Sequence, residues 1–214
     1  MEELTPSQIV LKFRSQEWLA GDGVGFQAGE GFWINLASVR VQRQALATLE
    51  PDVAPAVCAY ASRVSHWACG GPRGVLEAFP PHARRRSWAE LVGSTIFVCR
   101  PVGATPLQLL DVYERFLEDV TRKKDYPQMQ LAYYLAAMRP FWSSRSLTSL
   151  ALNATNHVCS ALYVEHVQNA GVPAFLSEEP SGEPCVPAYY FPARLLVTPR
   201  METLCCARIT GGDR

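Results

Sequence analysis

The sequence lacks a surplus of charge of either sign. Its 214 residues include 20 Lys and Arg and 20 Asp and Glu, so the formal net charge at pH 7 is zero. A balanced chain has no bulk electrostatic attraction to nucleic acid or to an anionic membrane, and we expect neither as a partner. The one local concentration is Arg84-Arg85-Arg86, predicted to lie in a loop. Three such arginines form either a solvated turn or a contact for a phosphate or carboxylate.

Long apolar runs are also missing. No stretch approaches the roughly 20 apolar residues that cross a bilayer, and residues 1–13 are acidic and polar where a secretory leader is basic and then apolar. We therefore expect a soluble, cytoplasmic protein without a transmembrane segment, although export by a route that needs no such leader stays open. Because 48% of the residues are hydrophobic and no low-complexity tract divides the chain, we expect one domain over residues 1–214, with two small domains as the alternative.

Cysteine pairs with metal-ligand spacing are absent. The chain has seven cysteines, an odd number, and none forms a Cys-x-x-Cys pair. Such cysteines are expected to be reduced and mostly buried, as small apolar side chains. His157, Cys159 and His166 lie close in sequence, but zinc needs a fourth ligand that this set does not offer. We therefore expect no metal and no cofactor.

Two segments carry the pattern of a helix start. Residues 5–8 and 105–108 both read Thr-Pro-x-Gln, with a threonine N-cap, a proline in the first turn and a glutamine three residues after the cap. This is a capping-box arrangement. The expected helices span residues 5–21, 37–49, 105–123, 128–138 and 155–173.

Strands are expected mainly in the middle of the chain. A short strand follows the glycine-rich residues 21–29, residues 63–83 form a hairpin around Gly-Gly-Pro-Arg, and residues 93–102 form a third strand of the same antiparallel meander. A short last strand is expected near residues 195–197. Strands and helices that gather in separate parts of the chain indicate an α+β domain.

Cys159 is a candidate nucleophile. If Asn156 caps the helix, Cys159 occupies its third position, where free backbone N–H groups and the helix dipole favour a thiolate. The same N–H groups could hold an oxyanion. The alternative is one more core cysteine, which is the more frequent role of such a residue.

His66 and Glu77 are the candidate partners of this cysteine. If the turn has the four residues Gly-Gly-Pro-Arg, Cys69 faces Gly74 and His66 stands directly opposite Glu77, about 5 Å apart at Cβ. At that distance a carboxylate can orient the imidazole, whose other nitrogen then acts as a base. Each residue alone would more often be an ordinary sheet residue. A Cys–His–carboxylate set is recognised by its geometry, because the chain order varies between folds.

A family resemblance covers roughly residues 19 to 200. The segments LAGDGVGFQAG, YASRVSHWACGGPRGVLEAFPPH, TIFVCRPVGAT, DYPQMQLAYY, HVCSALYVEHVQNAGV and FPARLLVTPRM resemble, in order and spacing, the permuted papain-like hydrolases of the YiiX-like group. These are relatives of the NlpC-type peptidases and of lecithin:retinol acyltransferase. The resemblance implies a circularly permuted papain-like fold, in which an antiparallel sheet or small barrel packs on a helical part with the nucleophile helix.

The resemblance also implies roles for individual residues. Cys159 would be the nucleophile, His66 the base and Glu77 the residue that orients it. We expect Tyr126, Ser65 and Trp67 to contact the substrate, although core packing is the more frequent role of a residue such as Tyr126. Asp22 matches the family's Gly-Asp turn and is expected to be structural.

Two functions from different classes follow. The first is a thiol hydrolase or acyltransferase that cleaves an amide or ester bond in a small-molecule, lipid or peptide substrate, including cell-wall peptide and protein isopeptide. The second is a catalytically inactive domain of the same fold that binds a ligand or a partner. Fold analogy supplies the reaction class and leaves the substrate open.

Overall fold

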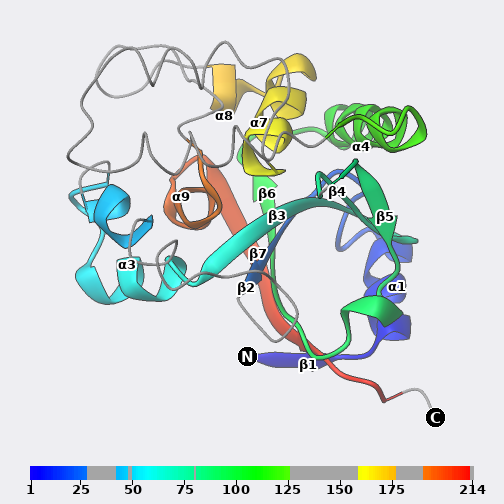
Figure 1. Cartoon of the computed structure of the whole chain (residues 1–214), viewed down its shortest axis with the longest axis horizontal. Coiled ribbons are helices and arrows are strands. Elements are labelled where there is room, and N and C mark those ends of the chain that lie inside the picture. The colour runs from blue at the N-terminus through cyan, green and yellow to red at the C-terminus, as the bar shows by residue number, and fades with distance from the viewer. Residues whose placement is uncertain (28–41, 48–49, 80, 126–158, 177–189, 213–214) are drawn as a thin grey trace.

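A curved mixed β-sheet organises the molecule (Figure 1). The computed structural model describes residues 1–27, 42–47, 50–79, 81–125, 159–176 and 190–212. Within these residues, seven strands form one sheet in the order β1-β7-β6-β2-β3-β4-β5. Only β1 and β7 pair in parallel. The strands are β1 (Glu2–Leu4), β2 (Gly23–Gln27), β3 (Val64–Gly71), β4 (Gly74–Glu77), β5 (Arg84–Arg86), β6 (Thr95–Pro101) and β7 (Met201–Ile209).

The described helices lie on both faces of this sheet. In Figure 1, α4, α7 and α8 lie above the strands, α3 and α9 lie beside them, and α1 closes the opposite side of the curve. Their bounds are α1 (Pro6–Arg14), α3 (Pro55–Ala61), the 3₁₀ helix η1 (Ala89–Leu91), α4 (Pro106–Thr121), α7 (Cys159–Asn169), α8 (Pro173–Leu176) and α9 (Pro192–Val197). Residues 42–47 are helical as well. The α+β class expected from the sequence is therefore observed.

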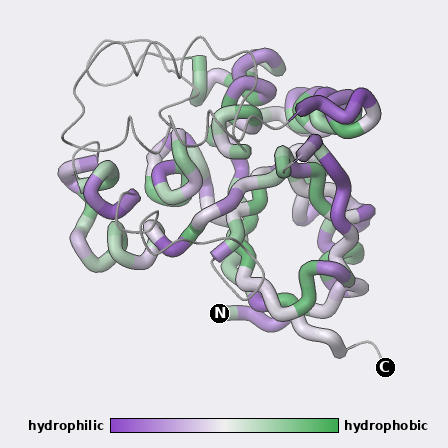
Figure 2. Tube along the Cα trace, in the orientation of Figure 1, coloured by the Kyte–Doolittle hydropathy of each residue, from purple (hydrophilic) through white to green (hydrophobic). Residues whose placement is uncertain are grey.

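Two apolar clusters fill the two faces of the sheet. A helix-side cluster joins the strands to α4, α7, α8 and α9 and contains Trp67, Phe116 and Leu162. An α1-side cluster joins the strands to α1 and contains Ile9 and Ala68. Because successive strand residues point to opposite faces, neighbours in one strand enter different clusters, as Trp67 and Ala68 do. Figure 2 shows the hydrophobic and hydrophilic residues interleaved along α4, which buries one face only.

Local sequence patterns locate the helix starts correctly. The Thr5 and Thr105 side chains each accept from the backbone N–H of the residue three positions on, and both capping boxes are complete. The first helix ends at Arg14, earlier than expected, because Gln16 has a φ of 62° and turns the chain. Of the helix expected over residues 37–49, only residues 42–47 are described. The helix expected over residues 128–138 lies outside the described residues.

Two expectations about strands are wrong, and one strand was missed. β6 pairs with β2 and β7, so it does not continue a meander from the hairpin. Residues 195–197 belong to α9, whose first turn contains Pro192, and the last strand is β7. β1 was not predicted, because a three-residue strand is stable only through its pairing with β7.

The Gly-Asp turn before β2 is structural, as expected. Asp22 is fully buried and accepts from the backbone N–H of Leu19, and its two carboxylate oxygens accept from Nε and Nη2 of Arg100. This pair fixes the chain where it enters β2, next to the strand that carries the candidate site. No helix of the described residues is both long and apolar enough to cross a bilayer.

Candidate active site

The β3–β4 hairpin is tighter than the sequence suggested. Gly71 pairs with Gly74 and Cys69 with Leu76, so the turn has two residues between paired glycines, where four had been expected. Gly74 has a φ of +124°, and a Cβ there would lie 1.9 Å from the carbonyl oxygen of Arg86. Only glycine accepts this conformation beside β5 without strain. The expectation that Cys69 faces Gly74 is therefore wrong by two residues.

His66 and Glu77 nevertheless meet. The observed register extrapolates to Ala68 opposite Glu77, which makes His66 a diagonal neighbour on the same face. A shift of two residues preserves the face, and a diagonal pair is within reach of long side chains. His66 Nε2 lies 2.8 Å from Oε2 of Glu77. Since Nε2 is used by the carboxylate, Nδ1 remains for a second partner.

Cys159 is a second partner of the His66 side chain. It stands in the first turn of α7, which packs against β3. Its thiol is hydrogen-bonded to the His66 side chain and accepts hydrogen bonds from the backbone N–H groups of Trp67 and Ser160. Pairing of β3 with β4 covers only residues 69–71 of β3. The earlier residues of β3 are therefore outside the backbone pairing with β4, on the strand against which α7 packs.

Burial and charge act in opposite directions on this pair. Burial lowers the pKa of His66, but the Cys159 thiolate and the Glu77 carboxylate outweigh it and raise the pKa to about 10. Burial likewise raises the pKa of the Cys159 thiol, while the His66 charge and the bound N–H groups bring it below its ordinary value. Both shifts favour a thiolate beside an imidazolium, which is the reactive form of a cysteine.

Glu77 remains ionised at the centre of a charged group. Burial raises the pKa of its carboxyl, but hydrogen bonds and charge from His66, Arg86 and Arg84 lower it to about 2. The predicted loop around Arg84-Arg85-Arg86 is wrong, because these residues form strand β5, which pairs with β4. The arginines were expected to form either a solvated turn or a contact for a phosphate or carboxylate. Arg84 and Arg86 contact a carboxylate, and it is that of Glu77 in the same chain.

The other predicted site residues have different positions. Trp67 is fully buried in the helix-side cluster, and its indole ring lies against Gly23 and Gly25. Its side chain therefore does not face a substrate. The part of Trp67 that reaches the candidate site is its backbone N–H, which bonds to the Cys159 thiol. Ser65 precedes His66, and its buried hydroxyl has no hydrogen-bond partner among the described residues. Tyr126 and the expected cap Asn156 lie outside the described residues.

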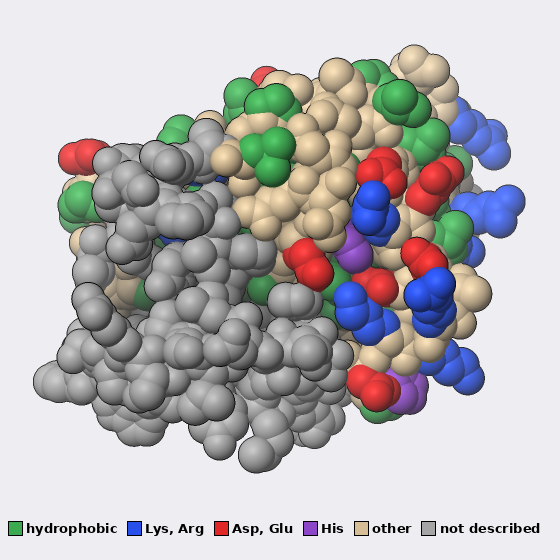
Figure 3. All heavy atoms as spheres, turned by 90° about the horizontal axis from the view of Figure 1, so that it is seen from above, with side chains coloured by type: hydrophobic (Ala, Val, Ile, Leu, Met, Phe, Trp, Pro, Cys, Tyr) green, Lys and Arg blue, Asp and Glu red, His purple; other side chains and the backbone are tan. Residues whose placement is uncertain are grey.

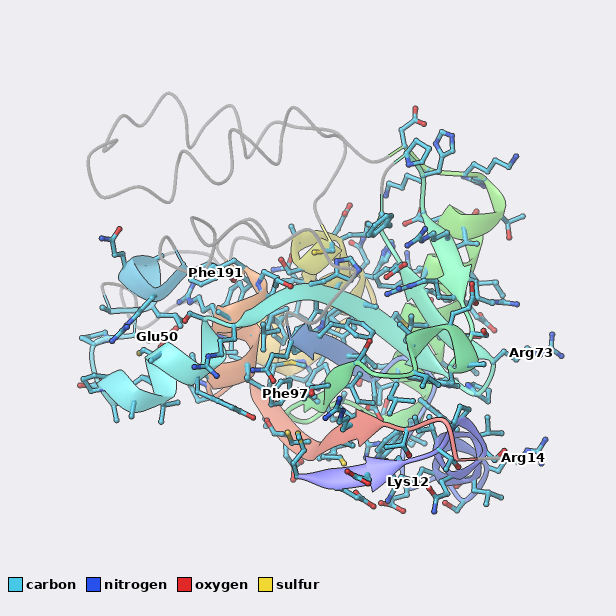
Figure 4. All side chains as sticks on the ribbon, turned by 60° about the horizontal axis from the view of Figure 1, so that its bottom comes forward. Lys12, Arg14, Glu50, Arg73, Phe97 and Phe191 are labelled. Carbon is cyan, nitrogen blue, oxygen red and sulfur yellow. The ribbon has the colours of Figure 1, made fainter. Side chains whose placement is uncertain are left out.

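Little of the candidate site is exposed. Cys159 is 6% exposed and His66 is 7% exposed. A cleft of about 500 Å³ lies elsewhere, between α1 and the β3–β4 turn. Arg14 and Arg73 line this cleft, and their side chains extend outward at the edge of the molecule in Figure 4. The candidate site and this cleft are therefore separate.

Charges of both signs lie side by side on the described part of the face seen in Figure 3. This agrees with the zero net charge of the chain. Across the described residues, no group of three or more His, Cys, Asp or Glu side chains could hold a metal ion. Six of the seven cysteines lie in the described residues, and all six are free thiols.

No family model, no curated protein and no solved structure matches this chain.

Proposed function

We propose that this protein is a thiol hydrolase or acyltransferase that attacks an amide or ester carbonyl through Cys159. The observation that carries the proposal is the contact of the Cys159 thiol with the His66 imidazole, whose Nε2 lies 2.8 Å from the Glu77 carboxylate. A nucleophile, a base and a group that orients the base are the three parts of a nucleophilic catalytic centre.

The proposed fold is a circularly permuted papain-like domain. Its support is the arrangement in which a strand delivers His66, the next strand delivers Glu77, and a later helix delivers Cys159 to the same place. The resemblance of the sequence motifs to the YiiX-like group points in the same direction. Fold and chemistry are both parts of the proposal.

The reaction begins with attack of the Cys159 thiolate on the carbonyl carbon, which forms a C–S bond and a negatively charged oxygen. As the tetrahedral intermediate collapses, the bond to the leaving nitrogen or oxygen breaks and His66 gives its proton to the leaving group. Neutral His66 then takes a proton from water or another acceptor, whose oxygen or nitrogen attacks the thioester. The acyl group leaves Cys159, which regains its thiolate beside protonated His66.

A hydrolysis and acylation experiment tests this proposal. The full chain is incubated with p-nitrophenyl esters of acetyl, hexanoyl and dodecanoyl groups and with peptide p-nitroanilides. We expect release of the nitroaromatic product and an acyl adduct on the peptide that contains Cys159, detected by mass spectrometry. Cys159→Ala should lose at least ~100-fold of the rate, because covalent catalysis is removed. Cys205→Ala removes a thiol outside the site and should keep the rate.

The opposite result would favour the second function. If wild type and Cys159→Ala release product equally slowly and no acyl adduct forms on any cysteine, the chain is better described as a binding domain. Because Cys159 is only 6% exposed, the chain-length series also reports how much room an acyl group has on its way to the thiol.

A further inference from the structure

The carboxylate of Glu77 binds far more than His66. It is fully buried, and Arg84 Nε donates a hydrogen bond to Oε1 at 2.8 Å. Arg86 Nη2 donates to Oε2 at 3.2 Å, and Arg86 Nε lies 2.8 Å from Oε1. With His66 on Oε2, both oxygens are therefore in contact with two cationic groups each. A carboxylate bound in this way has little freedom to rotate.

Strand pairing brings this group together. Arg84 is directly opposite Glu77, and Arg86 is two residues further along β5, opposite Val75. Both arginines therefore share a sheet face with Glu77, while Arg85 points to the other face. Arg86 is the more enclosed of the two, with a side chain 15% exposed, against 41% for Arg84.

Arg84 also makes contact with the site through an aromatic ring. Its guanidinium carbon lies 3.7 Å from the ring centroid of Phe79. The Phe79 ring in turn meets the His66 ring edge-on, with centroids 6.0 Å apart. Arg84, Phe79 and His66 therefore form a continuous packed row beside the carboxylate, which restricts the movement of the imidazole.

The arginines provide a counter-charge for Glu77 when the reaction removes the positive charge of His66. When His66 gives its proton to a leaving group, the imidazole becomes neutral, and Glu77 would be a buried carboxylate without a counter-charge. Such a group costs several kcal/mol or takes up a proton. Guanidinium groups stay charged at every pH of interest, so they compensate Glu77 in both states of His66.

We propose that Arg86 and Arg84 are positioning residues of the Cys159–His66–Glu77 set, which keep Glu77 ionised and fixed through the whole proton cycle of His66 and leave a net positive charge that favours the Cys159 thiolate. This inference deepens the proposed function and rests on it.

The described charged groups around the pair are few. Glu77 faces His66 from β4, and Arg84 and Arg86 face Glu77 from β5. Glu90, on η1, interacts with both arginines from the surface. His166, further along α7, pairs with Asp119 of α4 at 2.8 Å and lies two helical turns from Cys159. Removal of one arginine therefore changes the charge balance of the site directly.

The test measures the rate at which iodoacetamide alkylates Cys159 between pH 5 and pH 10, read by mass spectrometry on the full chain. Because the pKa of His66 is raised, we expect His66 to stay protonated across the rise of this profile, so that the thiol is the group that changes charge. We expect Arg86→Met to move the midpoint upward by about 0.5 to 1 pH unit, because a nearby cation is lost. Arg84→Met should move the midpoint less. Arg86→Lys keeps a positive charge and should leave the midpoint close to the wild-type value.

Arg85→Met is the matched control. It removes the same charge from the same strand on the face away from Glu77, and should move the midpoint by less than about 0.2 unit because solvent screens it. An equal shift in Arg85→Met, or no shift in folded Arg86→Met, would overturn the inference. If Arg86→Met does not fold, as judged by circular dichroism, Arg84→Met and Arg86→Lys decide. A wild-type Cys159 that ionises like an ordinary thiol would instead count against the proposed function.

Discussion

At the scale of single residues, surroundings separate one cysteine from the others. Burial raises the pKa of Cys99 to about 12. Burial and a hydrogen bond from its thiol to the Glu2 carboxylate, at 3.2 Å, raise the pKa of Cys205 to about 12. Cys159 is also buried, yet its pKa is lowered because an imidazolium lies beside it. The residue type is the same in all three, and the neighbouring charge decides the reactivity.

This difference predicts which thiol reacts first. At pH 7, limiting iodoacetamide should label Cys159 at least ~10-fold faster than Cys205, although Cys205 is the more exposed, because only Cys159 carries a substantial thiolate fraction. His66→Ala should remove the selectivity, and His82→Ala, at a half-buried histidine that pairs with Asp125 outside the site, should keep it. Faster labelling of Cys205 than of Cys159 in wild type would contradict the ion pair.

At the scale of elements, the β3–β4 turn sets the site. A turn of two residues places Glu77 diagonally from His66 and brings β5 against β4, so that Arg84 and Arg86 reach the carboxylate. Gly74 permits this close approach, since its backbone touches that of Arg86. Gly74 therefore helps to position the side chains of Glu77, Arg84 and Arg86.

Gly74→Ala tests this role of the turn. We expect a loss of unfolding free energy on the order of 3 kcal/mol, because the φ of +124° is strained for alanine and the Cβ meets the Arg86 carbonyl. Gly103→Ala is the control, since Gly103 has a φ of +74° and open space around it, and should cost about 1 kcal/mol. Urea denaturation measures both. Equal losses would show that the contact with β5 adds nothing.

At the scale of the whole molecule, the sheet separates two cores. Cys159 and Leu162 of α7 belong to the helix-side cluster, whereas Ile9 of α1 belongs to the α1-side cluster. The proposed catalytic set spans this division, because Cys159 comes from the helix side while His66 pairs with Phe26, whose ring lies in the α1-side cluster. The position of α7 on the sheet therefore controls the contact of thiol and imidazole.

A pair of core truncations should separate stability from reactivity. Leu162→Ala and Ile9→Ala each remove a buried aliphatic side chain and should each cost about 2 to 5 kcal/mol of unfolding free energy. Only Leu162→Ala should slow alkylation of Cys159 by several-fold under conditions where both variants are folded, because Leu162, unlike Ile9, is one of the side chains that pack α7 into the helix-side cluster. A similar slowing in Ile9→Ala would show that the two cores are coupled.

The sequence by itself determined the features that depend on near neighbours. Both Thr-Pro-x-Gln helix starts, the strand before and after the glycine turn, and the face shared by His66 and Glu77 follow from patterns within a few residues. Capping and two-residue alternation are local effects, so the local sequence contains the information.

Only the tertiary structure decided the hairpin register, the place of β6 beside β2, the helical form of residues 195–197 and the arginine contacts of Glu77. A turn of two or four residues satisfies the same local pattern, and a short apolar run can form either a helix or a strand. Such choices depend on which distant segments can be buried together, and the free energy of that burial belongs to the folded chain as a whole.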